Sequence, residues 1–591
     1  MKFDSLVSAG IGLRQKLARF PAEILCCCLL VMMGVNLFSN ARREAPTNDE
    51  LVHIPAGYYS LVGPDFRLNP EHPPLVKMWA CLPLLIIRPT VYASPDGASE
   101  ESGSFTVRAS REFWQVNQGH FKAITFWTRA PMVLLTLALG ALIFVYGRQF
   151  FGARAAVLSV ALFSLEPTML AHGWIVHTDV AAAFGYLLFL AVLQAYYRAP
   201  TLSRAFCFGL ATGLALLTKF SLVILIPIFF CALFYLAIRA HRFGSSRRQI
   251  ILQGCLACSV VLGLINAAYY FQHPALAQPE FDWLEQTVGT PLVAERIVTL
   301  FNLLSRIFPT YYVFGLYAIF AHNHFGHPAS LLGQYSSFGW WYYFPVAFAL
   351  KTSLPFLLLS IGAVCWALWA AVFRREKKLI PLLLGLAIYL ALSMTSNINI
   401  GIRHLAPVFP FLFLLGGACL DRLLKSTRVK AVAIVVVVLL GWMLVDGIRA
   451  YPNYLSFTNS LTFGKPAWAL LSDSNVEWGQ NIGELARYLK ARRETSLAGS
   501  MSASWVSPPL YGIRLLDFAP PDLQSSSTNY VAIGAGFLNG STVPPGLRDA
   551  NGIEITEEQR RNYFAKYRVL RPEKVFGNSI YLYRKHGRDG H

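Results

Sequence analysis

Two adjacent carboxylates, Asp49 and Glu50, follow the first long apolar segment of the sequence. Just outside a membrane, a carboxylate can orient or deprotonate a hydroxyl group presented at the lipid surface, so both residues are candidate catalytic groups. A structural explanation is also open. Carboxylates in the first turn of a helix interact favourably with the positive end of its dipole, and Thr47 or Asn48 would cap such a helix.

A second set of ionisable residues surrounds a pair of prolines. Glu71 and His72 stand directly before the pair, and Lys77 follows inside the apolar stretch 75–87, which is too short to cross a bilayer. We expect this stretch to form a helix in the membrane interface, where the three side chains would meet a phosphate head group. His72 and Lys77 would equally serve as anchors that extend their polar ends to water.

The loop at 166–179 brings His177 and Asp179 close to membrane depth. Ionisable residues are costly there, and a functional role is the default hypothesis. Helix capping is the alternative, with Thr178 or Asp179 at the start of the next helix. Both remain candidates, Asp179 for catalysis and His177 for substrate binding.

Three basic residues occur elsewhere on the same side of the predicted membrane. Arg403, beside His404, stands in a short loop that the charge bias of the chain should leave free of basic residues, so phosphate binding explains it better than topology does. Lys219 lies in a tight turn, and Lys351 near a run of aromatic residues. Both lysines could anchor the chain in an interfacial aromatic belt or help to hold an anionic lipid carrier.

The segments that must position these residues are long and apolar. Of the 591 residues, 55% are hydrophobic and only 14% are charged, whereas soluble domains carry about 25% charged residues. A segment of about 20 apolar residues crosses the hydrocarbon core of a bilayer. The sequence therefore predicts a polytopic α-helical membrane protein with about 11 transmembrane helices, at 20–39, 130–147, 155–171, 180–197, 205–218, 220–238, 250–270, 352–372, 379–396, 404–420 and 431–448.

The loops between these segments differ in charge. The chain has 51 Lys and Arg against 32 Asp and Glu, a net charge of +19, and most of the excess lies in loops on one side. The positive-inside rule makes that side, and the N-terminus, cytoplasmic. The bilayer thus explains a basic balance that would suggest nucleic acid in a soluble chain, and we expect no nucleic-acid partner.

This orientation divides the chain into two parts. Residues 1–448 form a transmembrane catalytic region with large outer loops at about 40–129 and 271–351. Residues 449–591 are polar and predict a small extracytoplasmic α/β domain, with a helix over 480–492 and strands over 530–535 and 579–583.

The order of these motifs resembles that of a known family, the bacterial phospholipid-carrier-dependent glycosyltransferases. They belong to the GT-C superfamily, alongside the protein O-mannosyltransferases and the lipid A aminoarabinose transferases. The stretches 451–456 and 473–480 also look similar to that group. The motifs that carry the resemblance are Asp49-Glu50, Glu71-His72 before Pro73-Pro74, Glu166-Pro167 with His177-Thr178-Asp179, and Arg403-His404.

The resemblance implies roles for individual residues. Asp49 matches the first-loop aspartate that acts as catalytic base or positions the acceptor, and Asp179 resembles the second acidic residue near the site. Glu71 and His72 match the pair near the carrier phosphate, with His72 in the place of the lysine of the aminoarabinose transferases. Arg403 resembles the arginine that meets the phosphate.

The resemblance also implies an activity. We expect transfer of a sugar, with inversion, from a polyprenyl-phosphate carrier to a hydroxyl of a protein, glycan or lipid acceptor, on the extracytoplasmic side of a bacterial inner membrane. No cofactor is required by this chemistry. A divalent metal ion held by Asp49, Glu50, His53 or Asp179 is a second hypothesis.

Two other functions fit a basic polytopic chain. A flippase for polyprenyl-linked lipids would typically place charges and helix breaks in the middle of its spans, often in repeated halves. A structural membrane subunit would use the motif carboxylates only as helix caps. The candidate residues gather instead at loop edges on one side, which favours the enzyme.

Overall fold

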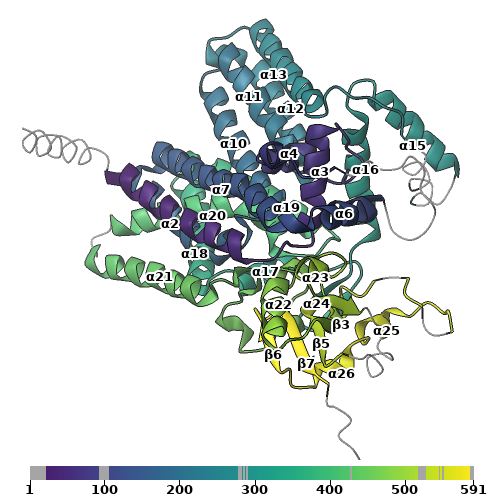
Figure 1. Ribbon diagram of the computed structural model, residues 1–591. Coiled ribbons are helices and arrows are strands. Elements are labelled where there is room, and N and C mark those ends of the chain that lie inside the picture. The colour runs from purple at the N-terminus through teal and green to yellow at the C-terminus, as the bar shows by residue number, and fades with distance from the viewer. Residues whose placement is uncertain are drawn as a thin grey trace, which may run out of the picture.

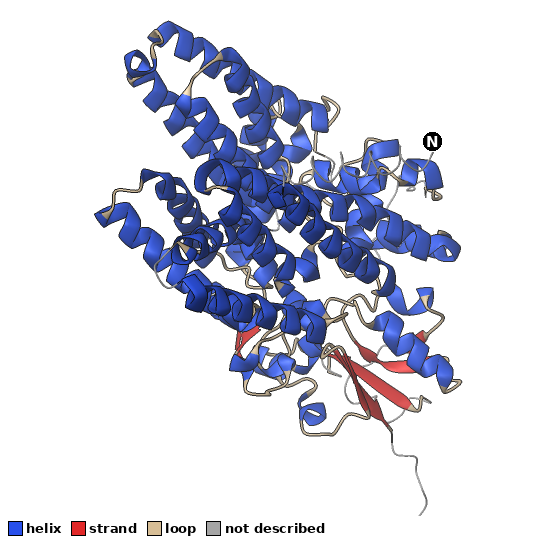
Figure 2. Cartoon of the chain, turned by 90° about the vertical axis from the view of Figure 1, so that its left-hand side faces the viewer, coloured by secondary structure: helices blue, strands red, loops and turns tan. Residues whose placement is uncertain are grey.

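A helical body with a small β-sheet at one end makes up the fold (Figures 1 and 2). The computed structural model describes residues 21–91, 105–276, 283, 287, 291–425, 429–516, 528–544, 546–548 and 551–585. The basic residues before Pro21, which contribute to the predicted orientation, lie outside these ranges.

The predicted membrane-spanning helices are confirmed. Within the described residues, nine helical segments are long and apolar enough to cross a membrane, and two shorter apolar helices, α8 (Ala153–Leu165) and α11 (Leu202–Leu216), match the two remaining predictions. The long segments contain α2 (Pro21–Arg43), α7 (Phe121–Phe151), α10 (Asp179–Arg198), α12 (Leu225–Ile238), α13 (Arg247–Ala268), α18 (Leu354–Phe373), α19 (Ile380–Met394), α20 (Phe409–Leu424) and α21 (Val429–Ala450).

Shorter elements connect these helices on the side of the predicted site. The stretch expected to form one interfacial helix is two helices that are separated at Leu82 and Pro83. The short elements are α3 (Glu50–Val62), α4 (Pro74–Cys81), α5 (Leu84–Ile87), α6 (Phe105–Val116), α9 (Pro167–His172), the 3-10 helix η2 (Phe220–Ile224), α15 (Pro291–Leu304), α16 (Thr310–Phe325), β1 (Ala329–Leu331), β2 (Gln334–Ser336) and α17 (Tyr343–Lys351).

A close contact between α3 and α4 fixes the turn that carries Glu71 and His72. Both Val76 and Lys77 of α4 are buried, and Gly57 of α3 faces them. A Cβ atom on Gly57 would lie 2.4 Å from the carbonyl oxygen of Lys77. Only a residue without a side chain therefore allows the two helices to approach this closely.

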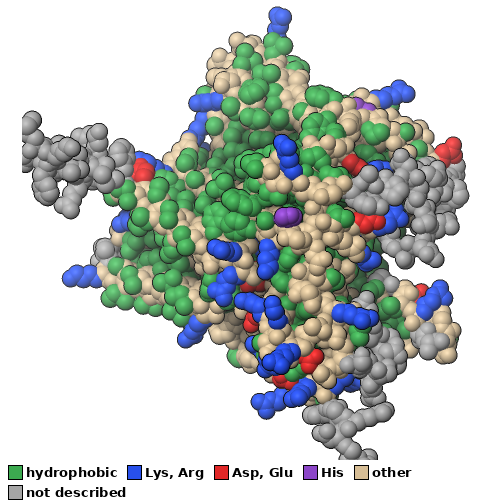
Figure 3. Space-filling view, viewed as in Figure 1, with side chains coloured by type: hydrophobic (Ala, Val, Ile, Leu, Met, Phe, Trp, Pro, Cys, Tyr) green, Lys and Arg blue, Asp and Glu red, His purple; other side chains and the backbone are tan. Residues whose placement is uncertain are grey.

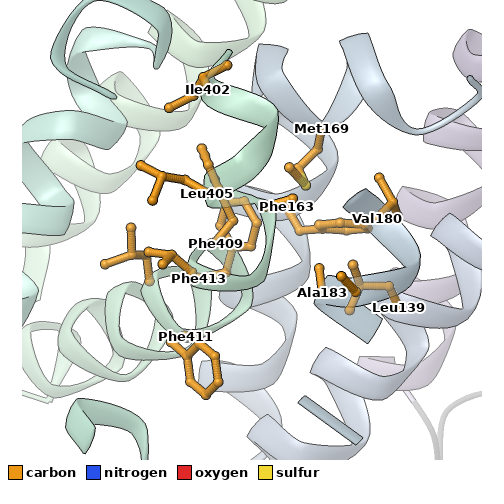
Figure 4. Close-up of a cluster of buried hydrophobic side chains, with 14 of the residues drawn as sticks. Leu139, Phe163, Met169, Val180, Ala183, Ile402, Leu405, Phe409, Phe411 and Phe413 are labelled. Atoms are coloured by element: carbon orange, nitrogen blue, oxygen red, sulfur yellow. The ribbon is translucent and has the colours of Figure 1, made fainter. Parts of the chain in front are cut away.

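Figure 4 shows part of the buried hydrophobic core. The ring of Phe163 in α8 packs edge to face on Phe413 in α20, with 5.7 Å between ring centroids. A 3-10 helix, η5 (Ile402–Val408), precedes α20, and its Ile402 and Leu405 are buried in the same core. Since these two residues are three apart, they share one face of η5 and fix the position of Arg403 between them.

The C-terminal part contains a five-stranded mixed sheet in the order β4-β3-β5-β7-β6. Three strands run parallel, and β7 pairs antiparallel with both β5 and β6. The predicted helix and strands are therefore confirmed as α22, β5 and β7. The elements are η9 (Asp473–Asn475), α22 (Ile482–Ala491), β3 (Ser496–Ser500), α23 (Ser507–Leu510), β4 (Arg514–Leu516), β5 (Tyr530–Gly534), α24 (Ala535–Leu538), α25 (Glu557–Arg561), α26 (Ala565–Arg568), β6 (Lys574–Phe576) and β7 (Ile580–Arg584).

The two parts differ in surface chemistry. Hydrophobic side chains cover most of the helical body in the view of Figure 3, whereas lysines and arginines gather over the sheet and its junction with the helices. A continuous apolar surface of this kind is expected for helices that face lipid.

Candidate active site

A cavity of about 1010 Å³ lies between the helical body and the C-terminal part. Known small-molecule sites span about 300 to 1000 Å³, so this one is large enough for a sugar with its phosphate. Its walls come from the start of α3, the 67–72 turn, α16, η5 and the segments 473–478 and 501–505. Six of the eleven predicted site residues line it, namely Asp49, Glu71, His72, Lys219, Arg403 and His404.

Asp49 is held between a cation and an indole. Its Oδ2 accepts a hydrogen bond of 2.9 Å from Nη1 of Arg403, and its Oδ1 accepts one of 3.2 Å from Nε1 of Trp478. Burial alone would raise the pKa of Asp49, but the Arg403 guanidinium outweighs it, with help from His53, and lowers the pKa below its ordinary value. Asp49 is therefore an ionised carboxylate that faces the cavity.

Arg403 joins Asp49 to the second predicted carboxylate. Its Nη1 lies 3.5 Å from Oδ2 of Asp179, its Nε donates to the Ser474 hydroxyl at 2.9 Å, and its guanidinium carbon lies 4.1 Å from the centre of the Trp478 ring. Among the described residues, Nη2 of Arg403 has no hydrogen-bond partner. That nitrogen is left to bind an anion in the cavity.

Asp179 lies behind the cavity wall at the start of α10. It forms an ion pair with Lys219, which does line the cavity. Nδ1 of His177 accepts the backbone N–H of Asp179 at 3.0 Å, and Nε2 of His177 lies 3.0 Å from the His172 carbonyl oxygen. Nδ1 of His177 also lies 3.0 Å from Oδ2 of Asp179. His177 thus orients the start of α10 and does not line the cavity.

The structure does not bring Glu50 to the cavity. Its side chain is fully buried and forms two short contacts with Arg129, at 2.6 and 2.7 Å. The backbone N–H groups of Thr47 and Val176 also donate to it, at 2.9 and 3.2 Å. With both oxygens occupied, Glu50 ties together the first and second outer loops. It does not face the cavity as Asp49 does, because residues one apart on a helix point in different directions.

The two predicted lysines outside the cavity also bind backbone. Nζ of Lys77 donates to the carbonyl oxygens of Asn69 and His72, at 2.6 and 3.0 Å, and so closes the 69–77 turn. Nζ of Lys351 donates to the Leu455 carbonyl oxygen at 2.6 Å. Because both side chains are buried, neither extends to water at the membrane surface, and neither is placed to meet a carrier phosphate.

The residues proposed for a metal ion do not form a ligand set. Nδ1 of His53 lies 3.0 Å from the Val176 carbonyl oxygen, Glu50 binds Arg129, and the two aspartates share Arg403. In the part of the chain that the structure describes, no group of three or more His, Cys, Asp or Glu could hold a metal ion.

Sequence reasoning missed a row of titratable side chains along the cavity. Nδ1 of His322 lies 3.6 Å from Oε2 of Glu71, Nε2 of His322 lies 3.1 Å from Nδ1 of His327, and Nε2 of His327 lies 4.0 Å from Oδ2 of Asp473. Burial lowers the pKa of His322, but the nearby Glu71 carboxylate outweighs this and raises it overall. Three histidines within six residues, at 322, 324 and 327, were the available signal.

A narrower apolar compartment of about 180 Å³ adjoins the cavity. The two share Glu71, His72, Lys219 and His404, while the compartment continues between η2, α16 and α19 along Phe220, Leu316, Phe320, Tyr389 and Leu392. Cationic and imidazole groups therefore stand where the two compartments meet.

Comparisons with known proteins give one family match. Residues 121–265 match the sequence model of the family described as dolichyl-phosphate-mannose-protein mannosyltransferase. This segment contains Arg129, Asp179 and Lys219. No curated protein matches the chain.

Solved structures of low sequence identity also match. ArnT from Cupriavidus metallidurans bound to undecaprenyl phosphate is 12% identical, with 94% of this chain and 97% of that chain covered and a TM-score of 0.46. The same protein in its apo state is also 12% identical, with 96% of this chain and 98% of that chain covered and a TM-score of 0.47. The archaeal oligosaccharyltransferase AglB from Archaeoglobus fulgidus, in complex with an inhibitory peptide and a dolichol-phosphate, is 11% identical. The match covers 86% of this chain and 69% of that chain, with a TM-score of 0.46. The resemblance predicted from the motifs is confirmed by the family match over 121–265.

Proposed function

We propose that the protein is a membrane glycosyltransferase that moves a sugar from a polyprenyl-phosphate carrier to an acceptor hydroxyl. One observation carries the proposal. An ionised aspartate, Asp49, and a partly unpaired guanidinium, Arg403, lie 2.9 Å apart in a cavity that adjoins an apolar compartment. Such a site offers one group to an acceptor hydroxyl, one to a phosphate, and a channel to a lipid tail. The acceptor is a protein, a glycan or a lipid.

The reaction needs little from the protein beyond positioning and charge. The acceptor oxygen forms a bond to the anomeric carbon as the bond from that carbon to the phosphate oxygen breaks, and the phosphate keeps the electron pair. A single displacement inverts the anomeric centre. Asp49 accepts a hydrogen bond from the hydroxyl and takes its proton. Because the pKa of Asp49 is low, it is a weak base that takes this proton late, when the new bond is well formed.

The leaving phosphate gains charge as the bond breaks. Arg403, Lys219 and His404 border the cavity, and the last two also border the apolar compartment. Donors fixed around the position where charge develops stabilise a transition state more than mobile water does. We assign these three residues to the carrier phosphate, with His72 beside them.

The same proposal places the site outside the cytoplasm of a bacterial cell. The excess of Lys and Arg in the loops opposite the cavity supports this orientation. A lipid-linked donor then needs no nucleotide at the site. The charged groups of the cavity lie at the outer ends of the helices, and a flippase would place its charges along a path between leaflets.

The proposal is tested by turnover in lipid. Purified protein is given radiolabelled polyprenyl-phosphate hexoses and pentoses, and sugar transfer or slow release to water is measured. We expect Asp49→Asn to lose about 100-fold or more of wild-type turnover, since general-base groups contribute about 10² to 10⁴.

A matched control comes from the opposite end of the helices. Asp421 also lies in an ion pair, 2.5 Å from Arg154, but far from the cavity, so Asp421→Asn should keep turnover. Equal activity of the Asp49 and Asp421 variants would contradict the proposal. Carrier movement between leaflets without sugar release would favour the flippase.

A further inference from the structure

A second cavity, of about 410 Å³, lies where the end of α2 meets α22 and β6. It shares a wall with the active-site cavity. In that wall the backbone N–H of Ala45 donates to the Gln480 carbonyl oxygen at 2.9 Å, and that of Asn48 donates to the Trp478 carbonyl oxygen at 2.8 Å. Asn48 and Trp478 line the first cavity, and Gln480 lines the second.

Charged groups of both signs line this second cavity without pairing. They are Arg43, Glu44, Glu484, Arg487 and Lys574. Among the described residues none of the five forms an ion pair within 4.0 Å, although such pairs form at many other places in the molecule. Arg43 donates to the Tyr451 hydroxyl at 3.1 Å and Nε of Arg487 to the Gly483 carbonyl oxygen at 3.3 Å, but no opposite charge within the described residues neutralises any of the five, so a ligand in the cavity can still interact with them.

A buried amide points to the same conclusion. Asn481 lines the cavity and is only 2% exposed. Its Nδ2 donates to Oδ1 of Asn453 at 2.8 Å, but its own Oδ1 is buried with no partner among the described residues. A buried polar atom is rarely left unpaired in a native protein, and a donor from a bound molecule would satisfy it.

The mixture of charges selects the class of ligand. A phosphate bound near Arg487 and Lys574 would also approach two glutamates, which would repel it. A cation bound near those glutamates would in turn be repelled by the basic side chains. Hydroxyl groups both donate and accept, so a neutral polyhydroxylated molecule can bridge carboxylates, guanidinium groups and amides at once. Burial raises the pKa of Glu44 to about 8, so at neutral pH its carboxyl group can also donate.

We propose that this second cavity is a saccharide-binding site, separate from the active site, that takes a neutral oligosaccharide through Asn481, Glu484 and Arg487. The inference goes beyond the transfer reaction. It requires only that the folded protein binds carbohydrate at this place, with or without turnover.

Direct binding tests the proposal. The full-length protein in lipid nanodiscs is probed with an array of neutral hexose and N-acetylhexosamine oligosaccharides, and with inorganic phosphate. We expect saccharide binding that Asn481→Ala and Arg487→Ala each weaken at least tenfold. Arg487 is exposed, so its truncation removes no core packing, and it keeps the test valid if Asn481→Ala fails to fold.

Two controls separate this site from the active site. Asn562→Ala, which truncates an exposed amide of the C-terminal part, and Asp49→Asn should both bind as the wild type does. The proposal is overturned if no oligosaccharide binds, if Arg487→Ala binds as tightly as Asn562→Ala, or if only phosphate binds. Loss of binding in Asp49→Asn would instead assign the saccharide to the active site. Since binding is measured without turnover, a failure here leaves the transferase test unaffected.

Discussion

Arg403 determines how Asp49 behaves, because its guanidinium lies between Asp49 and Asp179. In Arg403→Ala the two carboxylates lose the cation between them, and the pKa of Asp49 rises. The ionised form, which the reaction needs, then disappears at a higher pH.

The first prediction follows from this rise in the pKa of Asp49. We expect the acid limb of the rate profile to lie below about pH 4 in the wild type, since an unperturbed aspartate has a pKa near 3.9, and to move to higher pH in Arg403→Ala. Sugar release measured from pH 3.5 to 8 checks this. A lower rate with an unmoved acid limb would limit Arg403 to phosphate binding.

Glu50 and Asp49 are neighbours with different expected phenotypes. Removal of one partner from a buried ion pair costs about 3 to 5 kcal/mol, because the remaining charge stays buried and unpaired. We therefore predict that Glu50→Ala strongly lowers the melting temperature, since it strands Arg129. Glu376→Ala, which breaks the partly exposed pair with Lys378 at 3.9 Å, should cost less than about 1 kcal/mol. Thermal unfolding in detergent compares them, and equal melting temperatures would contradict the prediction.

The sequence suffices to find some site residues and not others. Asp49, Asp179 and Arg403 could be predicted because an unpaired charge at a helix end needs a reason. Glu50 looked equivalent to Asp49, since the sequence contains no sign that Arg129, 79 residues later, would bind it. The cluster of histidines at 322, 324 and 327 was a signal, but the pairing of His322 with Glu71 could not be predicted, because α16 and the turn that carries Glu71 are far apart in the sequence.

At the scale of elements, the contact between α3 and α4 sets the position of the phosphate-side turn. Gly57→Ala would put a Cβ atom 2.4 Å from the Lys77 carbonyl oxygen. We predict that α4 moves away, that the turn closed by Lys77 loosens, and that both the melting temperature and the apparent donor affinity fall.

The matched change is Gly263→Ala in α13, where a Cβ atom meets nothing within 4 Å. Alanine favours a helix over glycine by about 1 kcal/mol, so this variant should be as stable as the wild type or more so. Donor KM and thermal unfolding, measured on both variants, check the prediction. It fails if the two variants behave alike.

The length of an apolar run predicts that a helix spans the membrane, but it does not predict where that helix begins. The spans were predictable because each contains a long apolar run. The predicted span at 404–420 begins instead with the 3-10 helix η5, and α20 starts at Phe409. Proline at 407 and glycine at 401 interrupt regular α-helix here, and this irregular segment is the one that presents Arg403 to the cavity.

At the scale of the whole molecule, one carboxyl group joins the segment 473–478, which lines the active-site cavity, to the sheet of the C-terminal part. Glu477 is buried, and it accepts the backbone N–H groups of Ser502 at 2.6 Å and of Gly536 at 3.1 Å. A Cβ atom on Gly534 would lie 2.2 Å from its Oε1, so the strand β5 ends directly against this side chain. The attachment of the segment 473–478 to the sheet therefore depends on the charge state of Glu477.

The last prediction concerns the pH at which this junction weakens. Burial raises the pKa of Glu477 to about 7, against an ordinary value of 4.5. The folded protein therefore holds this proton more tightly than the unfolded chain, and the contribution of Glu477 to stability falls as pH rises from about 4.5 to 7. The difference is on the order of 3 kcal/mol across that range. We expect Glu477→Gln, which stays neutral, to remove this part of the pH dependence, at a pH-independent cost because its amide nitrogen cannot accept the second backbone N–H. Thermal unfolding at pH 5, 6, 7 and 8 tests the expectation, with Glu558→Gln as an exposed control in the same part of the chain. Parallel curves for the wild type and Glu477→Gln would show that the junction keeps its carboxylate charged, held by the two backbone N–H groups.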